Sequence, residues 1–211
     1  MTTTQKSLSR NQIRRLTITG MLTAIIILLA FTNLGLIPIG AIAITIIHLP
    51  VLIGLLAEGP VVGLILAFVF GACTLIKALI SPTGAFDPFF INPLVSILPR
   101  LFIPLGAWGV YRLLKGILPK KRAMESIAWG AAGLVGSLTN TVFVLFSIYM
   151  LYGKRVEEII SQVPDLAQYA NAAGKFLFFG VALPNGIPEA AVTMILIPAI
   201  MAAVAAVKKR R

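Results

Sequence analysis

The sequence predicts an all-α membrane protein, a single domain over residues 1–211 in which six transmembrane helices form a bundle with both termini in the cytoplasm. Three observations support this fold class. Hydrophobic residues make up 58% of the 211 residues and charged residues only 12%, whereas a soluble domain is roughly 25% charged. The apolar residues gather in long runs separated by Gly, Pro and charged residues. The net charge of +11 comes mostly from basic residues at the ends of these runs, so a nucleic-acid partner is not expected.

A helix that crosses a bilayer needs about 20 mostly apolar residues. Six runs are candidates, at about 16–34, 43–57, 61–80, 94–114, 127–151 and 176–207. The second run is short and contains Pro50, which is expected to kink or start its helix because proline lacks a backbone N–H.

The connections between the runs differ in character. Residues 35–45 are punctuated by Gly and Pro, and we expect a loop or re-entrant segment there. Residues 58–60 form a tight turn, which makes the second and third runs antiparallel neighbours. Residues 81–93 are rich in aromatic residues and Pro, and they predict a structured loop at an interface. Residues 152–174 are the longest polar connection, predicted to lie on the membrane surface as a lid or a short amphipathic helix.

The distribution of basic residues predicts the orientation. With six spans, 13 of the 18 Lys and Arg residues fall on the side that holds both termini. Cytoplasmic loops of membrane proteins carry an excess of Lys and Arg. Both termini are therefore expected in the cytoplasm, with the chain as a multi-pass protein of the plasma membrane.

Several polar residues are expected in the outer half of the bundle, where an ionisable group is costly and normally faces a protein interior or a wet cavity. They are His48, Lys77, Asp87, Asn92, Arg100, Asn140, Asn185 and Glu189. Asn185 and Glu189 are four residues apart and so share a helix face. Together these residues predict a polar pocket open to the outside, in which Arg holds a carboxylate and amides bind hydroxyl or peptide-like groups. Phe89, with its neighbours Phe86 and Phe90, could stack on a ring in such a ligand.

Each of these residues also has a purely structural alternative. Arg100 could snorkel to the outer headgroups, and Glu189 could pair with it or with another basic residue. Asn140 could form a hydrogen bond between helices, His48 could start a helix or hydrogen-bond across helices, and Lys77 could snorkel at the end of its helix. Asp87 could serve as a turn residue before Pro88.

An enzyme is not expected. The chain has one His and one Cys, too few for a His-rich or Cys-rich metal site, so neither a metal nor a catalytic residue is predicted. It has no Walker A pattern, so it is not expected to hydrolyse ATP itself. Six spans without a long internal repeat differ from a typical secondary transporter. The chain is therefore interpreted as a subunit that captures a substrate and works with other proteins.

The order and spacing of several motifs resemble a known family, the substrate-binding S components of energy-coupling factor (ECF) vitamin transporters. The resemblance covers nearly the whole chain, and within it the pantothenate type is the most similar. It rests on residues 20–24, 47–54, 58–63, 98–100 and 185–189, and the type on residues 31–40 followed by the His-Leu-Pro element.

This resemblance implies a mechanism and partners. An S component binds its vitamin from outside and docks on a transmembrane T component that carries two ATPase subunits, which use the ATP. It then topples in the membrane and delivers its substrate. Gly20 and Ala24, a pair of small residues that allows close helix approach, would contribute to docking. Arg100, Asn140 and Asn185 would bind the carboxylate, amide and hydroxyls of pantothenate, and residues 35–45 would gate the pocket.

Other functions stay open at this point. Riboflavin, a pyridoxine-like compound or another small vitamin could be the ligand. A stand-alone small facilitator or a structural membrane subunit is the alternative from another class. For Gly20 and Ala24 the alternative is ordinary packing inside the protein.

Overall fold

The computed structural model describes residues 9–39, 42–82, 86–119, 121–162, 168–169 and 172–209. Its long helices are α1 (Arg10–Phe31), α3 (Pro60–Ile80), α5 (Leu98–Ile117), α6 (Arg122–Ser161) and α8 (Ile187–Lys209). The shorter helical elements are η1 (Asn33–Gly35), α2 (Leu49–Glu58), η2 (Asp87–Ile91), α4 (Pro93–Ser96), α7 (Ala173–Lys175) and the π-helical segment η4 (Phe176–Gly186). Two strands, β1 (Leu36–Ile39) and β2 (Ile42–Thr45), complete the described part of the chain.

The helical membrane fold expected from composition is confirmed. Five helical stretches of the described chain are long and apolar enough to cross a membrane: Arg10–Phe31, Pro60–Ile80, Pro93–Ile117, Arg122–Ser161 and Ala173–Val207. The predicted second span is different. Only α2, with 10 residues, is helical there, and it rises about 15 Å, roughly half the hydrocarbon thickness. It starts beside Pro50 as expected, and the six-span count stays a prediction.

The segment expected to be a loop at 35–45 contains a β-hairpin instead. Strands β1 and β2 pair antiparallel, with Leu36 opposite Thr45, and the Ile46 amide donates to the Gly35 carbonyl. Two short strands rich in Ile fit the β preference of branched side chains, and Pro38 is tolerated because a two-stranded sheet has only edge strands. The described fold is therefore helical, as expected, with one short hairpin added.

The outer connection also differs from the prediction. Helix α6 continues to Ser161 through a kink at Tyr152, whose backbone is non-helical (φ −134°, ψ 16°). Val156 and Ile160 beyond the kink are fully buried and pack with Phe176 in an apolar cluster. Residues 152–161 thus extend α6 instead of forming a separate surface helix. The predicted continuation through 163–167 lies outside the described residues.

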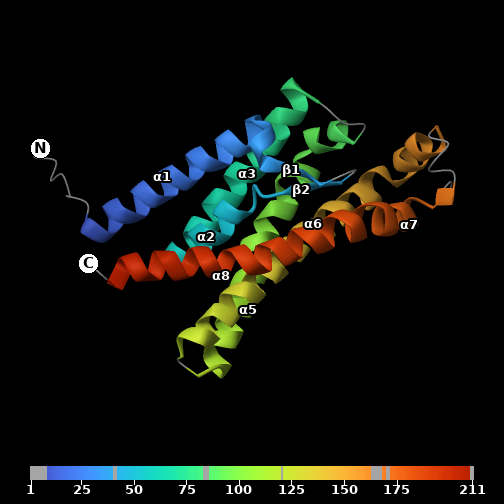
Figure 1. Cartoon of the computed structure of the whole chain (residues 1–211). Helices are drawn as coiled ribbons and strands as arrows, with labels where there is room; N and C mark the ends of the chain where they lie inside the picture. Colours follow the sequence, from blue (N-terminus) through green and yellow to red (C-terminus); the bar gives the residue numbers. More distant parts are fainter. Residues whose placement is uncertain are drawn as a thin grey trace, which may run out of the picture.

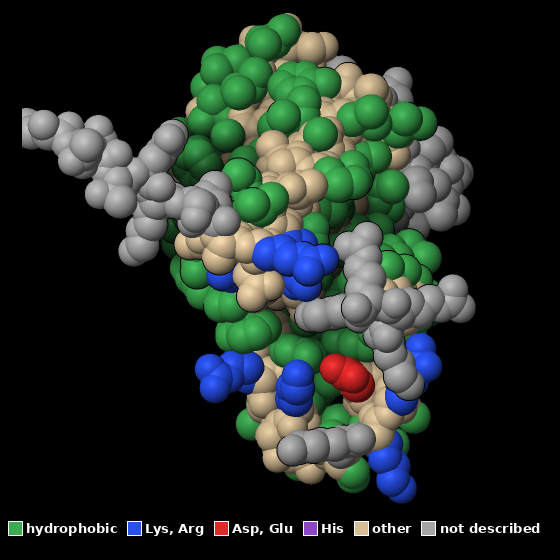
Figure 2. Space-filling view, turned by 90° about the vertical axis from the view of Figure 1, so that its left-hand side faces the viewer, with side chains coloured by type: hydrophobic (Ala, Val, Ile, Leu, Met, Phe, Trp, Pro, Cys, Tyr) green, Lys and Arg blue, Asp and Glu red, His purple; other side chains and the backbone are tan. Residues whose placement is uncertain are grey.

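The start of α1, the end of α8 and the turn between α5 and α6 lie at one end of the molecule, and the hairpin and the end of α6 lie towards the other (Figure 1). Lys and Arg side chains gather on the face at the first end (Figure 2). The start of α1 and the end of α8 therefore share one end of the molecule, as expected for termini on the same side.

The turn between α2 and α3 lies between antiparallel helices, as predicted, and Gly59 adopts the positive φ of 99° that the turn needs.

Candidate functional site

A cavity of about 780 Å³ lies between the hairpin, α3, α6 and the η4–α8 helix, and it is the candidate site. Its polar lining residues are Thr45, Thr74, Lys77, Asp87, Arg100, Asn140, Thr141, Asn185 and Glu189. Four residues predicted from the sequence to bind substrate are among them: Arg100, Asn140, Asn185 and Glu189. The structure therefore brings together side chains from three long helical segments that are far apart in the sequence.

Arg100 forms the basic wall of this cavity. It follows Pro99 in the first turn of α5, and only 5% of its surface is exposed. Its guanidinium carbon lies 5.3 Å from the Phe70 ring centroid and 5.2 Å from the Phe90 ring centroid, both within cation–π range. This packing fixes the guanidinium in place and excludes the snorkelling alternative.

The hydrogen bonds of Arg100 are incomplete. Its Nη1 donates to the Val95 carbonyl at 2.6 Å, and its buried Nε has no partner. Among the described residues, the ion pairs are those of Glu58 with Arg14 and Arg15, so no carboxylate pairs with Arg100. A buried guanidinium normally has a paired anion, and the cavity offers the space for one.

Glu189 lies in the first turn of α8, 7% exposed. Its Oε1 accepts a 2.7 Å hydrogen bond from the Thr45 amide at the end of β2. The Thr193 hydroxyl one turn later donates to the Glu189 carbonyl and lies 2.7 Å from His48 Nε2. Since the hydroxyl has a single proton, His48 Nε2 must donate to it. These bonds join the hairpin, the start of α2 and α8 beneath the cavity.

Two amides complete the polar wall. Asn140 on α6 is 9% exposed, and its buried Oδ1 has no hydrogen-bond partner among the described residues. Asn185 lies near the end of the π-helical segment η4, one residue before Gly186. A Cβ on Gly186 would lie 2.9 Å from Thr141 Cγ2, so the glycine permits η4 to approach α6 closely beside Asn140. π-Helical turns occur frequently at functional sites.

The rest of the cavity wall is apolar. Val144, Leu145 and Ile148 continue along α6 from Asn140, and Leu177 and Val181 face the cavity from η4. Phe86 and Phe90 border it from η2 and its flank. The cavity thus suits a small amphipathic molecule with an anionic end, amide or hydroxyl groups and an aliphatic part.

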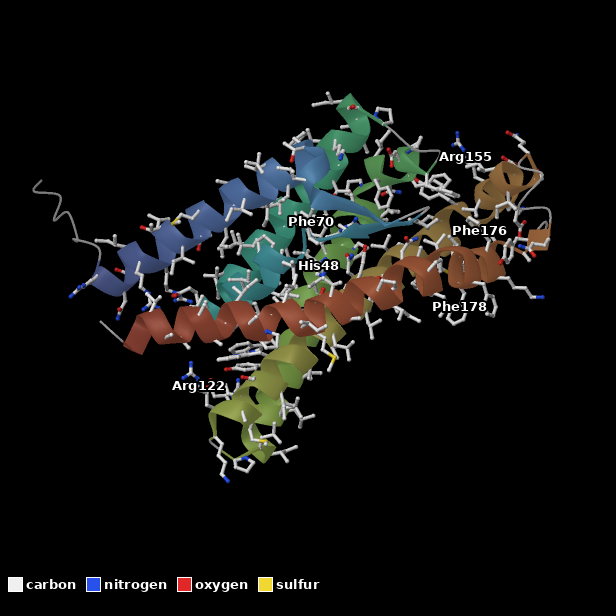
Figure 3. All side chains as sticks on the ribbon, viewed as in Figure 1. His48, Phe70, Arg122, Arg155, Phe176 and Phe178 are labelled. Carbon is white, nitrogen blue, oxygen red and sulfur yellow. The ribbon has the colours of Figure 1, made fainter. Side chains whose placement is uncertain are left out.

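Three predicted substrate-binding residues do not line this cavity. Phe89 is 2% exposed and stacks on Tyr152, with ring centroids 4.7 Å apart. Asn92 caps α4 by accepting from the Leu94 amide and donates to the Tyr152 hydroxyl. His48 is 1% exposed and is bound to Thr193 beneath the cavity, and Figure 3 shows it in the interior with Phe70. Each is enclosed by packing or already hydrogen-bonded, so none of the three lines this cavity, and their direct contact with a substrate stays a prediction.

Other lining residues were missed at the sequence level. Phe70 lies seven residues before Lys77 on α3, which is two helical turns and therefore the same face; this spacing is a usable signal. Thr141 follows Asn140 directly. Thr45 could not have been found, because its backbone amide rather than its side chain makes the contact.

The predicted docking residues are uncovered. Gly20 and Ala24 are both exposed on α1, and a Cβ built on Gly20 meets no atom within 4 Å. Around them Met21, Ile25 and Leu28 are 62%, 43% and 52% exposed. Packing inside the described part of the protein is therefore not the reason for these small residues, and α1 presents an apolar face that a lipid or a partner helix can cover.

Comparisons with known proteins show the family of this chain. The chain is 30% identical over 170 residues to the "Pantothenic acid transporter PanT" of Lactococcus lactis subsp. cremoris (strain MG1363), an alignment that covers 75% of this chain and 76% of the relative. The family model "ECF transporter, substrate-specific component" matches residues 14–201, which includes every residue of the cavity wall. The chain therefore belongs to the substrate-specific components of ECF transporters.

Proposed function

We propose that this chain is the pantothenate-binding subunit of an ECF importer and that the cavity beneath the hairpin is its binding site. The single observation that carries the proposal is Arg100, a buried cation in the cavity wall without a carboxylate partner among the described residues. Pantothenate has one carboxylate, which can accept hydrogen bonds from the unpaired N–H groups of this guanidinium. The similarity to a protein named for pantothenic acid transport supports the same ligand.

The other functional groups of pantothenate match the remaining wall. Its amide and hydroxyls can bond to Asn140 and Asn185, which both line the cavity. Its dimethyl group fits beside Val144, Ile148 and Val181. Of the two carboxylates in the wall, Glu189 already accepts a hydrogen bond from the Thr45 amide, and Asp87 also has an interaction partner. Pantothenate would thus lie with its charged end at α5 and its branched end against α6.

Delivery requires partners. We expect the chain to dock through the α1 face around Gly20 and Ala24 on a transmembrane T component, which carries two ATPase subunits. ATP use by these subunits would topple the chain in the plasma membrane, with both termini in the cytoplasm, and release the vitamin inside. Small residues on α1 support this role because they let helices approach closely. The chain itself then needs no cofactor and catalyses no reaction.

The test is a binding titration of the purified chain with pantothenate, riboflavin and pyridoxine. Saturable binding of pantothenate, with no competition by the other two vitamins, is the expected result. Preferential binding of riboflavin or pyridoxine would contradict pantothenate as the ligand but would leave the family assignment unchanged. Mass spectrometry of small molecules that co-purify with the chain provides an independent check.

A further inference from the structure

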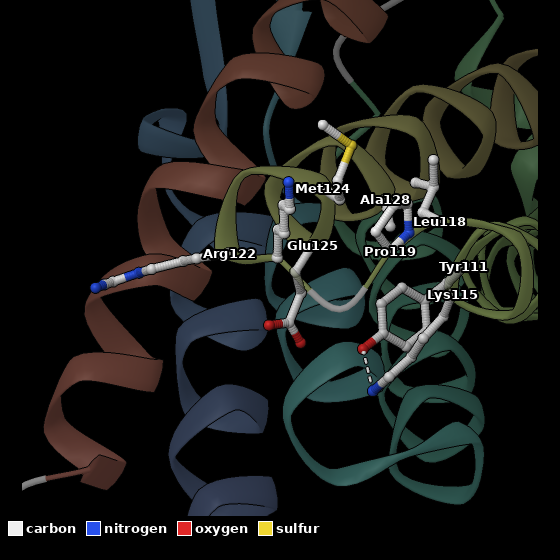
Figure 4. A pocket seen from close by; sticks show the side chains of 9 residues that line it. Tyr111, Lys115, Leu118, Pro119, Arg122, Met124, Glu125 and Ala128 are labelled. Carbon is white, nitrogen blue, oxygen red and sulfur yellow. Dashed lines mark hydrogen bonds between the residues drawn. The ribbon is translucent and has the colours of Figure 1, made fainter.

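A second cavity lies at the opposite end of the molecule, at the turn between α5 and α6. It has a volume of about 330 Å³, and Figure 4 shows it from close by. We call it the α5–α6 pocket, lined by Tyr111, Lys115, Leu118, Pro119, Lys121, Arg122, Met124, Glu125 and Ala128. The transport function proposed above gives this pocket no role.

The pocket combines a closed floor with a charged rim. Tyr111 and Ala128 are 6% and 2% exposed and form the floor. The Lys115 ammonium donates to the Tyr111 hydroxyl at 3.1 Å and lies 5.3 Å from the centroid of its ring. Lys115 and Arg122 lie on opposite sides of Glu125 (Figure 4). Three basic side chains and one carboxylate therefore leave the rim with an excess of positive charge.

Large apolar side chains border the same turn and are uncovered. Leu113 and Ile117 lie four residues apart on α5, 62% and 70% exposed, and Ile127 on α6 is 54% exposed. An apolar surface next to a basic rim has the polarity of the boundary between acyl chains and headgroups. Basic pockets between transmembrane helices bind anionic lipid headgroups in this position.

We propose that the α5–α6 pocket binds the phosphate of an anionic phospholipid, with phosphatidylglycerol as the preferred lipid. The phosphodiester anion is held by Lys115, Lys121 and Arg122, and the acyl chains cover Leu113, Ile117 and Ile127. Glu125 would repel a doubly charged phosphate but accepts hydrogen bonds from hydroxyl groups, so a singly charged headgroup with glycerol hydroxyls fits better than a bare phosphate.

The test uses the full chain purified in detergent and native mass spectrometry to count retained lipids. The probes are phosphatidylglycerol, phosphatidylcholine and phosphatidylmethanol, which is also a singly charged phosphodiester but has no headgroup hydroxyls. The pocket variant is K115Q/K121Q/R122Q. The matched control is K154Q/R155Q/K175Q, which removes the same charge from exposed residues of α6 and α7; Arg155 and Arg122 lie at opposite ends of the molecule (Figure 3).

The wild type and the control should retain phosphatidylglycerol in preference to both other lipids. The pocket variant should lose this retention by about tenfold or more, since every basic side chain near a membrane surface adds to the binding of anionic lipid. Unchanged pantothenate binding would show that it is folded. If the triple variant is not folded, the single variant Lys115→Gln is used instead, and a smaller loss of lipid retention is expected.

Four outcomes would overturn the proposal. The first is equal retention of phosphatidylglycerol and phosphatidylcholine by the wild type. The second is equal retention of phosphatidylglycerol by the pocket and control variants. The third is displacement of the lipid by inorganic phosphate, which would indicate that the pocket binds a soluble anion. The fourth is a pocket variant that keeps its lipid but no longer assembles with the transporter module, which would indicate a protein interface. Equal retention of phosphatidylmethanol by the wild type would remove the role assigned to Glu125.

Discussion

The Glu189 carboxylate holds the hairpin through the Thr45 amide, at 2.7 Å between oxygen and nitrogen, although the two residues are 144 positions apart in the chain. The bond lies at the cavity wall, to which both residues contribute. The carboxylate therefore has a positioning role, since its hydrogen bond connects the hairpin to the first turn of α8.

Replacing Glu189 separates this role from direct ligand contact. Glu189→Gln keeps an oxygen that can accept a hydrogen bond from the Thr45 amide, although this bond is then between neutral groups and is weaker. Pantothenate affinity should therefore change by less than about threefold. Glu189→Met removes the acceptor and leaves the amide unsatisfied, at a cost of about 1–3 kcal/mol. Amide hydrogen exchange over residues 42–46 should then accelerate and pantothenate binding should weaken.

Asn185→Ala supplies the comparison for the same site. It should weaken binding more than Glu189→Gln does and leave exchange in the hairpin unchanged. If Glu189→Met left the exchange rate of the hairpin amides as in the wild type, the hairpin would be held by other contacts and the positioning role would be wrong.

Thr193 connects His48 to α8, and its loss should affect stability more than binding. Thr193→Val keeps the shape of the side chain but leaves the fully buried His48 Nε2 without its partner. An unsatisfied buried donor costs about 1–3 kcal/mol. The apparent melting temperature in detergent should fall by several degrees, while pantothenate affinity of the folded protein stays within about threefold. A loss of binding at unchanged melting temperature would instead place this pair in the binding site.

Gly71 allows α3 to approach the junction of α4 and α5, next to the wall that holds Arg100. A Cβ at this position would lie 2.7 Å from Ile97 Cα and 2.8 Å from the Ser96 carbonyl oxygen. Gly71→Ala should therefore destabilise the fold by about 1–3 kcal/mol through overpacking. Gly109→Ala on α5 is the control, because a Cβ there meets nothing within 4 Å. Equal melting temperatures of the two variants would show that the helices can move apart without cost.

Ala24→Trp tests the docking face on α1. Ala24 is exposed, so the larger side chain should not disturb the isolated chain, and pantothenate binding should stay unchanged. Co-purification with the T component and the two ATPases should be lost, because the ring prevents close helix approach. The control is Ile195→Trp on α8, where the native side chain is 71% exposed and assembly should persist. Assembly of Ala24→Trp at the wild-type level would exclude this face.

Much of the helical framework could be predicted from the sequence, because long apolar runs with polar ends have few alternatives in a membrane. The hairpin could not, since Gly and Pro in residues 36–45 indicate a break in the helical pattern but do not predict the strand pairing that the structure shows. The continuation of α6 past Tyr152 was missed for another reason. Polar residues such as Glu157 and Glu158 suggested a surface segment, whereas Val156 and Ile160 on the other face are fully buried.

The candidate site shows the same division. Arg100, Asn140, Asn185 and Glu189 were predicted because polar groups within apolar runs need a reason to be there, and the structure places all four at one cavity. Burial decides between binding and structural roles, and burial depends on packing that spacing does not reveal. Phe89 and Asn92 show this, since both are engaged with Tyr152, 60 residues from Asn92 in the chain.

The measurement that tests the central claim most directly compares pantothenate with pantothenol, its neutral alcohol analogue, on the wild type and on Arg100→Met. The wild type should bind pantothenate at least about tenfold more tightly, because a hydrogen bond to a charged group contributes about 1.5–3 kcal/mol. Arg100→Met should lose this preference, whereas Lys77→Met, which removes the other basic residue of the cavity wall, should retain most of it. An Arg100→Met variant that still prefers pantothenate to the same degree would contradict the assignment of Arg100 as the carboxylate-binding residue.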